Sequence, residues 1–304
     1  MDNVIIENEF GRAVVSPGAG AALRSVRVKS GGSEHELLYG GDADLDPSAL
    51  PHGAGSFIMA PWPNRIRDGR LVAPDGEHSL PVNSGVHAIH GLVREKQWEI
   101  VEKTTARVKL RVQLRKPWPY KGAVISETAL AGPALQQTLT VEAALGEPEF
   151  PAGFGWHPWF RRTLGHPAGP GQASGQVSLQ ADVDGMWVLD PTITPTGDVV
   201  KPPILAELHK GATLAAGSID GCFRMRRGHK ATLSWPEVTL TIVSSPAVSH
   251  LMVYTPKDGT ALCVEPQTCA VNAFQLAAQG IPGTGAATAA PGRPLTGWTR
   301  WSWA

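Results

Sequence analysis

The 304-residue sequence predicts an all-β fold, a large antiparallel β-sandwich. Its clearest pattern is the segment Ala106–Arg115, where polar residues alternate with the apolar residues Val108, Leu110, Val112 and Leu114. A period of two places alternate side chains on opposite faces of a strand. Apolar residues at helical spacing over more than three turns are scarce, so few helices are expected. Many half-buried strands favour antiparallel sheets that pack face to face.

The same alternation recurs along the chain in segments bounded by Gly, Pro, Asn or Asp. These segments predict strands at Leu23–Val28, Leu135–Leu145, Gln176–Val183, Ala231–Trp235 and Val238–Val243. One short helix is expected at Ile204–Lys210, with Gly211 as its C-cap. The segment Leu276–Leu295 is rich in Ala, Gly, Thr and Pro and is expected to form a surface excursion before a last strand at Trp298–Trp303.

The domain organisation follows from length and composition. A sandwich can exceed 200 residues as one unit, and no linker divides the chain into compositionally distinct halves. We therefore expect one domain over residues 1–304. The alternative is two β domains joined by a linker near Gly165–Gly175.

Charge and cysteine usage exclude several classes of protein. Lys and Arg number 27, as do Asp and Glu, so the net charge is zero, and the basic excess typical of nucleic-acid or membrane-surface binders is missing. The three cysteines are too few for a disulfide framework and favour a reducing compartment. The first residues are acidic where a secretory signal is basic, and no run of about 18 apolar residues occurs, so a cytoplasmic location is expected.

No known nucleophile, phosphate-binding or metal motif is present. The chain has neither Gly-x-Ser-x-Gly nor Gly-x-x-x-x-Gly-Lys-Ser/Thr. His87 and His90 are three apart, which on a strand places them on opposite faces, and zinc would need further ligands. We expect no metal and no organic cofactor.

Two titratable residues lie in otherwise apolar strings. His157 stands between Trp156 and Pro158, and Glu265 follows Ala261–Val264. Such groups are costly to bury unless they are paired or used. Histidine transfers protons at neutral pH, and a carboxylate ending an apolar strand tends towards a raised pKa and a role as base. Each residue also has a plain structural interpretation, a core histidine bonded to a carbonyl and a carboxylate paired with an arginine.

Other polar residues suit the recognition of hydroxyl groups. Arg65 and Arg67 offer planar forks of donors, although a solvated ion pair is the plainer interpretation. Asp220, between Ile219 and Gly221, accepts hydroxyl hydrogen bonds or caps a turn. Gly91 after His90 predicts a turn, or alternatively a close backbone approach to a ligand.

Taken in order, these strings resemble the aldose 1-epimerase family, the galactose-mutarotase-like enzymes. The resemblance spans most of the chain and rests on Asn64-Arg65-Ile66 with Asp68-Gly69, His90-Gly91, Gly155-x-His157-Pro158-x-Phe160, Asp220 with Phe223, and Glu265-Pro266-Gln267 with Asn272-Ala273-Phe274. It implies the galactose mutarotase-like supersandwich, with Glu265 as general base and His157 as general acid. It also implies substrate binding by Arg65, His90, Asp220, Asn64 and Gln267.

The resemblance implies anomerisation of an aldose, in which the base removes the C1 hydroxyl proton while the acid protonates the ring oxygen. Ordinary pKa values would leave a window with Glu265 as carboxylate and His157 as imidazolium. Leu92 stands where many galactose mutarotases have a second glycine, so the string from Ala60 to Arg65 is more similar to a branch that includes sulfoquinovose mutarotases. The expected partner is a small-molecule sugar whose identity is open.

The sequence leaves two other functions open. A non-catalytic carbohydrate-binding protein on the same fold needs aromatic platforms but no acid and base across the ring. A glycoside-cleaving enzyme needs two carboxylates flanking a bond, for which Asp220 and Glu265 are candidates. Half of the twenty aromatic residues are Trp, and four of these adjoin site strings: Trp62, Trp98, Trp156 and Trp159. We expect one or two of them to contact substrate and the rest to fill the core.

Overall fold

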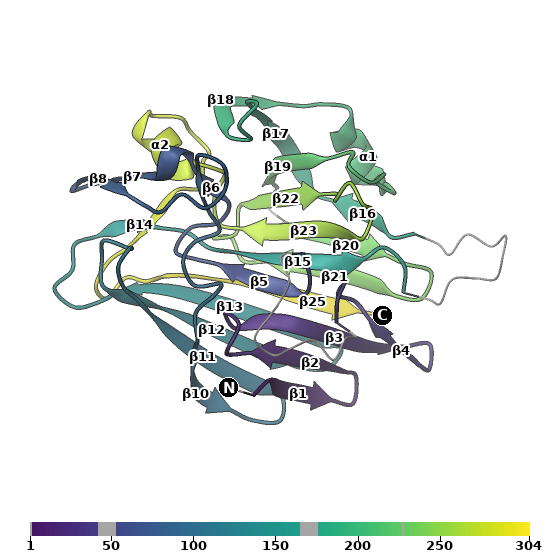
Figure 1. Ribbon diagram of the computed structural model, residues 1–304. Coiled ribbons are helices and arrows are strands. Elements are labelled where there is room, and N and C mark those ends of the chain that lie inside the picture. Colours follow the sequence, from purple (N-terminus) through teal and green to yellow (C-terminus); the bar gives the residue numbers. More distant parts are fainter. Residues whose placement is uncertain (1, 42–52, 165–175, 227) are drawn as a thin grey trace.

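In a computed structural model, residues 2–41, 53–164, 176–226 and 228–304 are described, and most strands belong to two large sheets (Figure 1). The first is 11-stranded and antiparallel. Its order is β1 (Val4–Asn8), β2 (Gly11–Ser16), β3 (Ala22–Ser30), β5 (Ser56–Met59), β15 (Gly155–Arg161), β23 (Ala261–Gln267), β22 (His250–Tyr254), β19 (Asp220–Met225), β17 (Val183–Leu189) and β18 (Pro195–Val200), with β4 (Ser33–Glu36) paired to β3.

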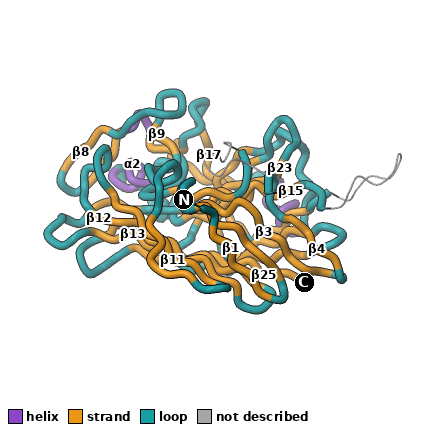
Figure 2. The backbone as a smooth tube through the Cα atoms, turned by 60° about the horizontal axis from the view of Figure 1, so that its bottom comes forward, coloured by secondary structure: helices purple, strands orange, loops and turns teal. Residues whose placement is uncertain are grey.

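The second sheet is 8-stranded and packs against the first, as Figures 1 and 2 show from two sides. Its order is β10 (Glu99–Lys103), β11 (Arg107–Leu114), β12 (Gly122–Leu130), β13 (Ala134–Ala143), β25 (Leu295–Trp303), β21 (Thr239–Ser244), β20 (Lys230–Ser234) and β16 (Ser178–Ala181). One buried cluster joins the facing sides of both sheets and contains, among others, Trp156, Phe160, Leu139, Leu240 and Trp301. The expected antiparallel β-sandwich is confirmed.

Smaller elements lie around the two large sheets, some of them beside the outer face of the 11-stranded sheet, the face turned away from the 8-stranded sheet (Figure 1). They comprise the pairs β6 (Arg65–Ile66) with β9 (Ala88–Ile89), β7 (Arg70–Ala73) with β8 (Gly76–Ser79) and β14 (Phe150–Ala152) with β24 (Ala287–Ala289), the 3-10 turn η1 (Arg67–Gly69), and the helices α1 (Ile204–Lys210) and α2 (Ala273–Ala278). A second buried cluster joins α2 to this outer face through Leu276, Cys222 and Met252. The outer face is therefore partly covered.

The strand and helix predictions agree closely with the structure. All six alternating segments contain strands, the helix Ile204–Lys210 has the predicted bounds, and the last strand β25 begins at Leu295. The surface excursion Leu276–Leu295 is exposed or half-buried along most of its length, but it also contains the end of α2 and the strand β24, which its Ala and Gly content did not indicate.

The domain prediction concerns a segment that the structure does not describe. The alternative linker at residues 165–175 lies outside the described residues. Strands from both sides of this segment share each large sheet, since β15 pairs with β23 and β13 pairs with β25. The assignment of one domain stays a prediction.

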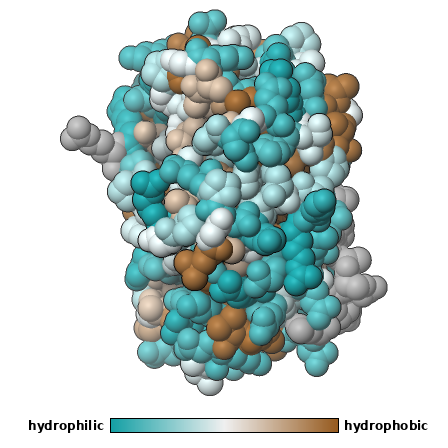
Figure 3. All heavy atoms as spheres, turned by 90° about the vertical axis from the view of Figure 1, so that its left-hand side faces the viewer, coloured by the Kyte–Doolittle hydropathy of each residue, from teal (hydrophilic) through white to brown (hydrophobic). Residues whose placement is uncertain are grey.

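The molecular surface shows no broad apolar area on the side drawn in Figure 3, where hydrophobic residues form separate spots among hydrophilic ones. Isolated exposed apolar residues are normal for globular proteins. Among the described residues, no helix is long and apolar enough to cross a membrane.

Candidate active site

His157 and Glu265 are cross-strand neighbours at the centre of the outer face of the 11-stranded sheet. The pairs Gly155–Gln267 and Trp159–Cys263 fix the register of β15 on β23 and bring the two residues opposite each other. Their side chains point away from the interior between the sheets, because the alternate residues Trp156 and Val264 belong to that core. His157 Nε2 lies 3.3 Å from Glu265 Oε1.

Burial drives both groups towards their neutral forms. Glu265 is 2% exposed and His157 6%. Loss of hydration raises the pKa of Glu265 well above its usual value, and the charge of Asp220 raises it further while Arg65 opposes. Loss of hydration also lowers the pKa of His157 to about 3, and Arg94 contributes in the same direction. The carboxylate and imidazolium expected from ordinary pKa values are therefore not the resting forms of this pair.

Aromatic rings hold the imidazole of His157 in place. The Phe57 ring centroid lies 4.5 Å from that of His157 and 5.4 Å from that of His90, and the two imidazoles are 5.3 Å apart. Trp159 also stacks on His157, with centroids 5.3 Å apart and planes 5° from parallel. The guanidinium of Arg94 lies over Phe57, 5.1 Å from the ring centroid. Proton donor and acceptor atoms of His157 are thus fixed in orientation.

Left-handed backbone conformations bring His90 and Arg65 to this site. His90 has φ of 62° and Asn64 has φ of 50°, and the His90 N–H donates to the Asn64 carbonyl at 2.9 Å. A side chain at Gly91, where φ is 70°, would collide with the carbonyl of Ala60. Gly91 therefore lies against the chain's own backbone at Ala60, and a close approach to a ligand stays a prediction. Non-glycine residues at positive φ are uncommon and tend to mark functional sites.

The expectation of one strand through His87 and His90 is wrong, because β9 comprises only Ala88–Ile89. His87 instead joins two loops: its Nδ1 accepts from the Asp68 N–H at 3.2 Å, and its Nε2 donates to the Thr192 carbonyl at 3.1 Å. Both ring nitrogens are therefore used within the fold, which makes His87 a structural residue.

The segment that carries Arg65, formed by β6 and η1, is held by hydrogen bonds from α2 and from the residue before that helix. Arg67 N–H donates to Asn272 Oδ1 at 3.1 Å, and Gln275 Nε2 donates to the carbonyls of Arg67 and Arg70 at 2.9 and 2.7 Å. Asn272, with φ of 57°, also donates its own N–H to the Arg65 carbonyl at 2.8 Å. Arg67 forms an ion pair with Asp190. This agrees with the plainer interpretation of Arg67, an ion pair, over the recognition of sugar hydroxyl groups.

Arg65 and Asp220 supply opposite charges next to the pair. Burial lowers the pKa of Arg65, while Asp220 and Glu265 raise it. Loss of hydration raises the pKa of Asp220, and Arg65 opposes that shift. Asn64 Oδ1 accepts from Arg65 Nη1 at 3.2 Å, and Asn64 is only 3% exposed, so its amide orients the guanidinium.

Gln267 lies two residues beyond Glu265 on β23 and is fully buried. Its Nε2 donates to the Cys269 carbonyl at 2.8 Å. This hydrogen bond ties the end of β23 to the turn before α2, a structural role that the sequence did not indicate.

One set of possible metal ligands coincides with the pair. Ligand atoms of His157, Cys263 and Glu265 all lie within 4.8 Å of one another. Burial raises the pKa of the Cys263 thiol well above its usual value, and the charge of Glu265 adds to the shift. Zinc is bound by the thiolate form, so a metal bound here would have to displace the thiol proton.

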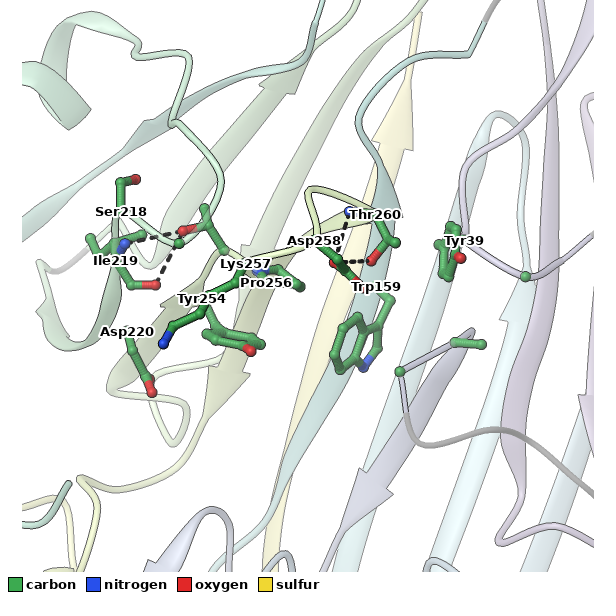
Figure 4. A pocket seen from close by; sticks show the side chains of 15 residues that line it. Tyr39, Trp159, Ser218, Ile219, Asp220, Tyr254, Pro256, Lys257, Asp258 and Thr260 are labelled. Carbon is green, nitrogen blue, oxygen red and sulfur yellow. Dashed lines mark hydrogen bonds between the residues drawn. The ribbon is translucent and has the colours of Figure 1, made fainter. Parts of the chain in front are cut away.

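A cavity of about 890 Å³ is lined among others by Trp159, Asp220, Tyr254 and Lys257 (Figure 4), and Trp159 is the ring that stacks on His157. Trp159 is the tryptophan that reaches the cavity, whereas Trp62, Trp98 and Trp156 are buried in the core.

The sequence did not indicate Phe57 and Tyr254, because they are far from the other site residues along the chain. Trp159 could be found, since it is two residues from His157 and so shares its strand face.

Comparisons with known proteins show the family and the fold of this chain. Residues 2–300 match the family model described as aldose 1-epimerase. The chain is 26% identical over 236 residues to the uncharacterized Escherichia coli K12 protein YihR, covering 75% of this chain and 74% of that one. A galactose mutarotase-like protein from Clostridium acetobutylicum superposes with a TM-score of 0.82 at 18% identity, over 99% of this chain and 95% of that one. An aldose epimerase homologue from C. elegans superposes with a TM-score of 0.80 at 16% identity, over 100% of this chain and 98% of that one. The chain belongs to the aldose 1-epimerase family.

Proposed function

We propose that this protein catalyses the cofactor-independent anomerisation of an aldose, with Glu265 and His157 as the base and acid. The observation that carries the proposal is the 3.3 Å separation of Glu265 Oε1 and His157 Nε2. Anomerisation moves one proton off the C1 hydroxyl and one onto the ring oxygen, and both oxygens are bonded to C1. A base and an acid that serve them must therefore be neighbours, as these two groups are.

The proposed reaction balances without any outside reactant. The Glu265 carboxylate takes the C1 hydroxyl proton, and the electron pair of that O–H bond forms the C1 carbonyl. The bond between C1 and the ring oxygen breaks, and the ring oxygen takes the proton of the His157 imidazolium. Rotation about C1–C2 presents the other carbonyl face, and the reverse steps close the ring. Each positioned proton transfer typically contributes about 10²–10⁴-fold.

The neutral resting pair is compatible with this mechanism. A protonated Glu265 with a neutral His157 holds the same number of protons as a carboxylate with an imidazolium. Transfer of one proton between Glu265 Oε1 and His157 Nε2 interconverts the two forms without solvent. Such a coupled pair titrates as a unit, so its pH dependence belongs to both residues together.

Neighbouring residues would hold the sugar. Arg65 donates and Asp220 accepts, which suits adjacent hydroxyl groups. His90 lies beside His157 at the site. Asn64 would act through Arg65, to which it is bonded, and Gln267 through the end of β23. The zero net charge suits a small-molecule sugar rather than nucleic acid.

We also propose a cytoplasmic location, because all three cysteines are free thiols. Cys222 and Cys269 belong to one buried cluster and are nevertheless unpaired. Unpaired cysteines are typical of proteins from reducing compartments.

The experiment follows the equilibration of a freshly dissolved anomer by polarimetry or exchange NMR. Glu265→Gln should lower the catalysed rate at least about 10²-fold while sugar binding remains measurable. The matched control is Glu99→Gln, the same change on the exposed edge strand β10. An undiminished rate in Glu265→Gln would refute the assignment of the base. Sugar binding by the unaltered protein without acceleration would favour the alternative, a non-catalytic carbohydrate-binding protein.

A further inference from the structure

The thiol of Cys263 lies beside the acid and base and takes no part in the proposed reaction. Cys263 is two residues before Glu265 on β23, so both side chains lie on the outer face of the sheet. Its cross-strand partner is Trp159, two residues beyond His157 on β15. The ligand atoms of the three residues all lie within 4.8 Å of one another. The sheet therefore brings a thiol, an imidazole and a carboxyl group together at one point.

The spacing of these groups is close to that of a zinc site. Tetrahedral zinc, with bonds of about 2.0–2.2 Å to nitrogen and oxygen, holds those ligand atoms about 3.3–3.5 Å apart. His157 Nε2 and Glu265 Oε1 are already 3.3 Å apart. A thiolate sulfur, about 2.3 Å from the metal, would lie about 3.6 Å from each of the other two ligand atoms. The set spans at most 4.8 Å, so side-chain movements of about 1 Å would bring all three ligands into range.

Hydrogen bonding and charge at this point also suit a divalent cation. Glu265 Oε2 is buried and has no hydrogen-bond partner among the residues that the structure describes. A buried polar atom without a partner is costly, and a bound cation would supply one. Burial lowers the pKa of His157 to about 3, so at pH 7 its imidazole is neutral, the form that binds metals. A thiolate and a carboxylate would balance the two charges of the ion, so the buried complex carries no net charge.

We propose that Cys263, His157 and Glu265 form an inhibitory site for a thiophilic divalent cation, with Zn²⁺ as its probe; only the effect on activity rests on the proposed function. The ion would displace the Cys263 thiol proton and the proton that His157 and Glu265 share, and a water or a sugar hydroxyl would take the fourth position. With the cation on both groups, neither could exchange a proton with the sugar. Soft ligands of this kind favour zinc over the hard cation Mg²⁺.

The first measurement is a titration of Co²⁺ into the protein after treatment with EDTA and gel filtration. Thiolate bound to Co²⁺ gives a charge-transfer band in the near ultraviolet, which we expect here and which Zn²⁺ should abolish by displacing the weaker ion. Cys263→Ala should lose the band. The double variant Cys222→Ala/Cys269→Ala, which leaves Cys263 as the only thiol, should keep it.

The double variant and the unaltered protein decide on the site even if Cys263→Ala does not fold. Absence of the band from the unaltered protein would overturn the proposal. Its persistence in Cys263→Ala, or its loss from the double variant, would overturn it too.

The second measurement is the rate of anomerisation with increasing Zn²⁺, each variant being compared with its own rate in EDTA. Zn²⁺ should abolish the activity of the unaltered protein, and EDTA should restore it. Cys263→Ala should need at least about tenfold more Zn²⁺ for half inhibition, since even residues behind metal ligands change affinity about 10–100-fold. Equal sensitivity of the two proteins, or equal inhibition by Mg²⁺, would overturn the inhibitory role. A lack of anomerisation in EDTA would refute the proposed function alone, because the Co²⁺ spectrum reports on the metal site independently.

Discussion

Glu265 Oε1 and His157 Nε2 lie 3.3 Å apart on adjacent strands, and each side chain is almost fully buried. Burial acts on them in opposite directions, because it raises the pKa of a carboxyl group and lowers that of an imidazole. The pair therefore keeps one proton over a wide pH range. Anomerisation needs one group that donates a proton and one that accepts a proton, and a pair that shares a single proton provides both.

The pH dependence of activity should reflect this shared proton. We expect kcat/KM to stay level from pH 7 to pH 5, where a free imidazole titrates, because the pKa of His157 lies at about 3. It should fall on the alkaline side, where Glu265 loses the proton and neither group can protonate the ring oxygen. The measurement is kcat/KM for anomerisation across pH. An acid limb centred near pH 6.5 would contradict the buried state of His157.

Asp220→Asn should move the alkaline fall of kcat/KM to lower pH. The charge of Asp220 raises the pKa of Glu265, so its removal lets Glu265 ionise more easily. The kcat value will also fall if Asp220 holds the sugar, but the position of the limb reports the electrostatic effect separately. Asp258→Asn is the matched control, because Asp258 also lines the cavity but does not act on Glu265. A limb shifted equally in both variants would refute this coupling.

Glu265→Gln should stabilise the folded protein at neutral pH. The raised pKa of Glu265 means that, above its ordinary value of 4.5, the unfolded chain ionises while the folded chain does not, so stability falls as pH rises towards the folded pKa. Each unit of pKa difference corresponds to about 1.4 kcal/mol. Denaturant unfolding at pH 7 should show a gain for the variant that shrinks by pH 4. Equal stability of both proteins at pH 7 would show that Glu265 is not held in its neutral form.

Gln275→Ala should weaken substrate binding through Arg65. Gln275 Nε2 holds the carbonyls of Arg67 and Arg70, and loss of a buried partner costs about 1–3 kcal/mol of stability. KM should rise more than kcat falls, because His157 and Glu265 lie on strands that do not depend on this loop. Gln279→Ala, an exposed residue just after the same helix, is the control for unfolding and kinetics. A fall in kcat with unchanged KM would contradict the positioning role.

The sequence by itself determined the strands and the kinds of side chain that do chemistry. Alternation with a period of two is local, since it needs only that one face of a strand be buried, and it correctly predicted strands such as β11 and β13. The separate strings around Arg65, His157 and Glu265 could be recognised from residue type and order. Nothing local indicated the hydrogen bonds that Asn64 and Gln267 make to Arg65 and to the Cys269 carbonyl, and their contact with a substrate stays a prediction.

Only the tertiary structure decided which of these residues meet. Cross-strand register between β15 and β23 places His157 opposite Glu265, and this pairing joins positions more than a hundred residues apart. The same long-range packing removes water from both groups and so reverses the protonation expected from their ordinary pKa values. It also assembles Trp159, Tyr254 and Tyr39 around one cavity. Burial and register depend on the whole fold, and no local pattern carries them.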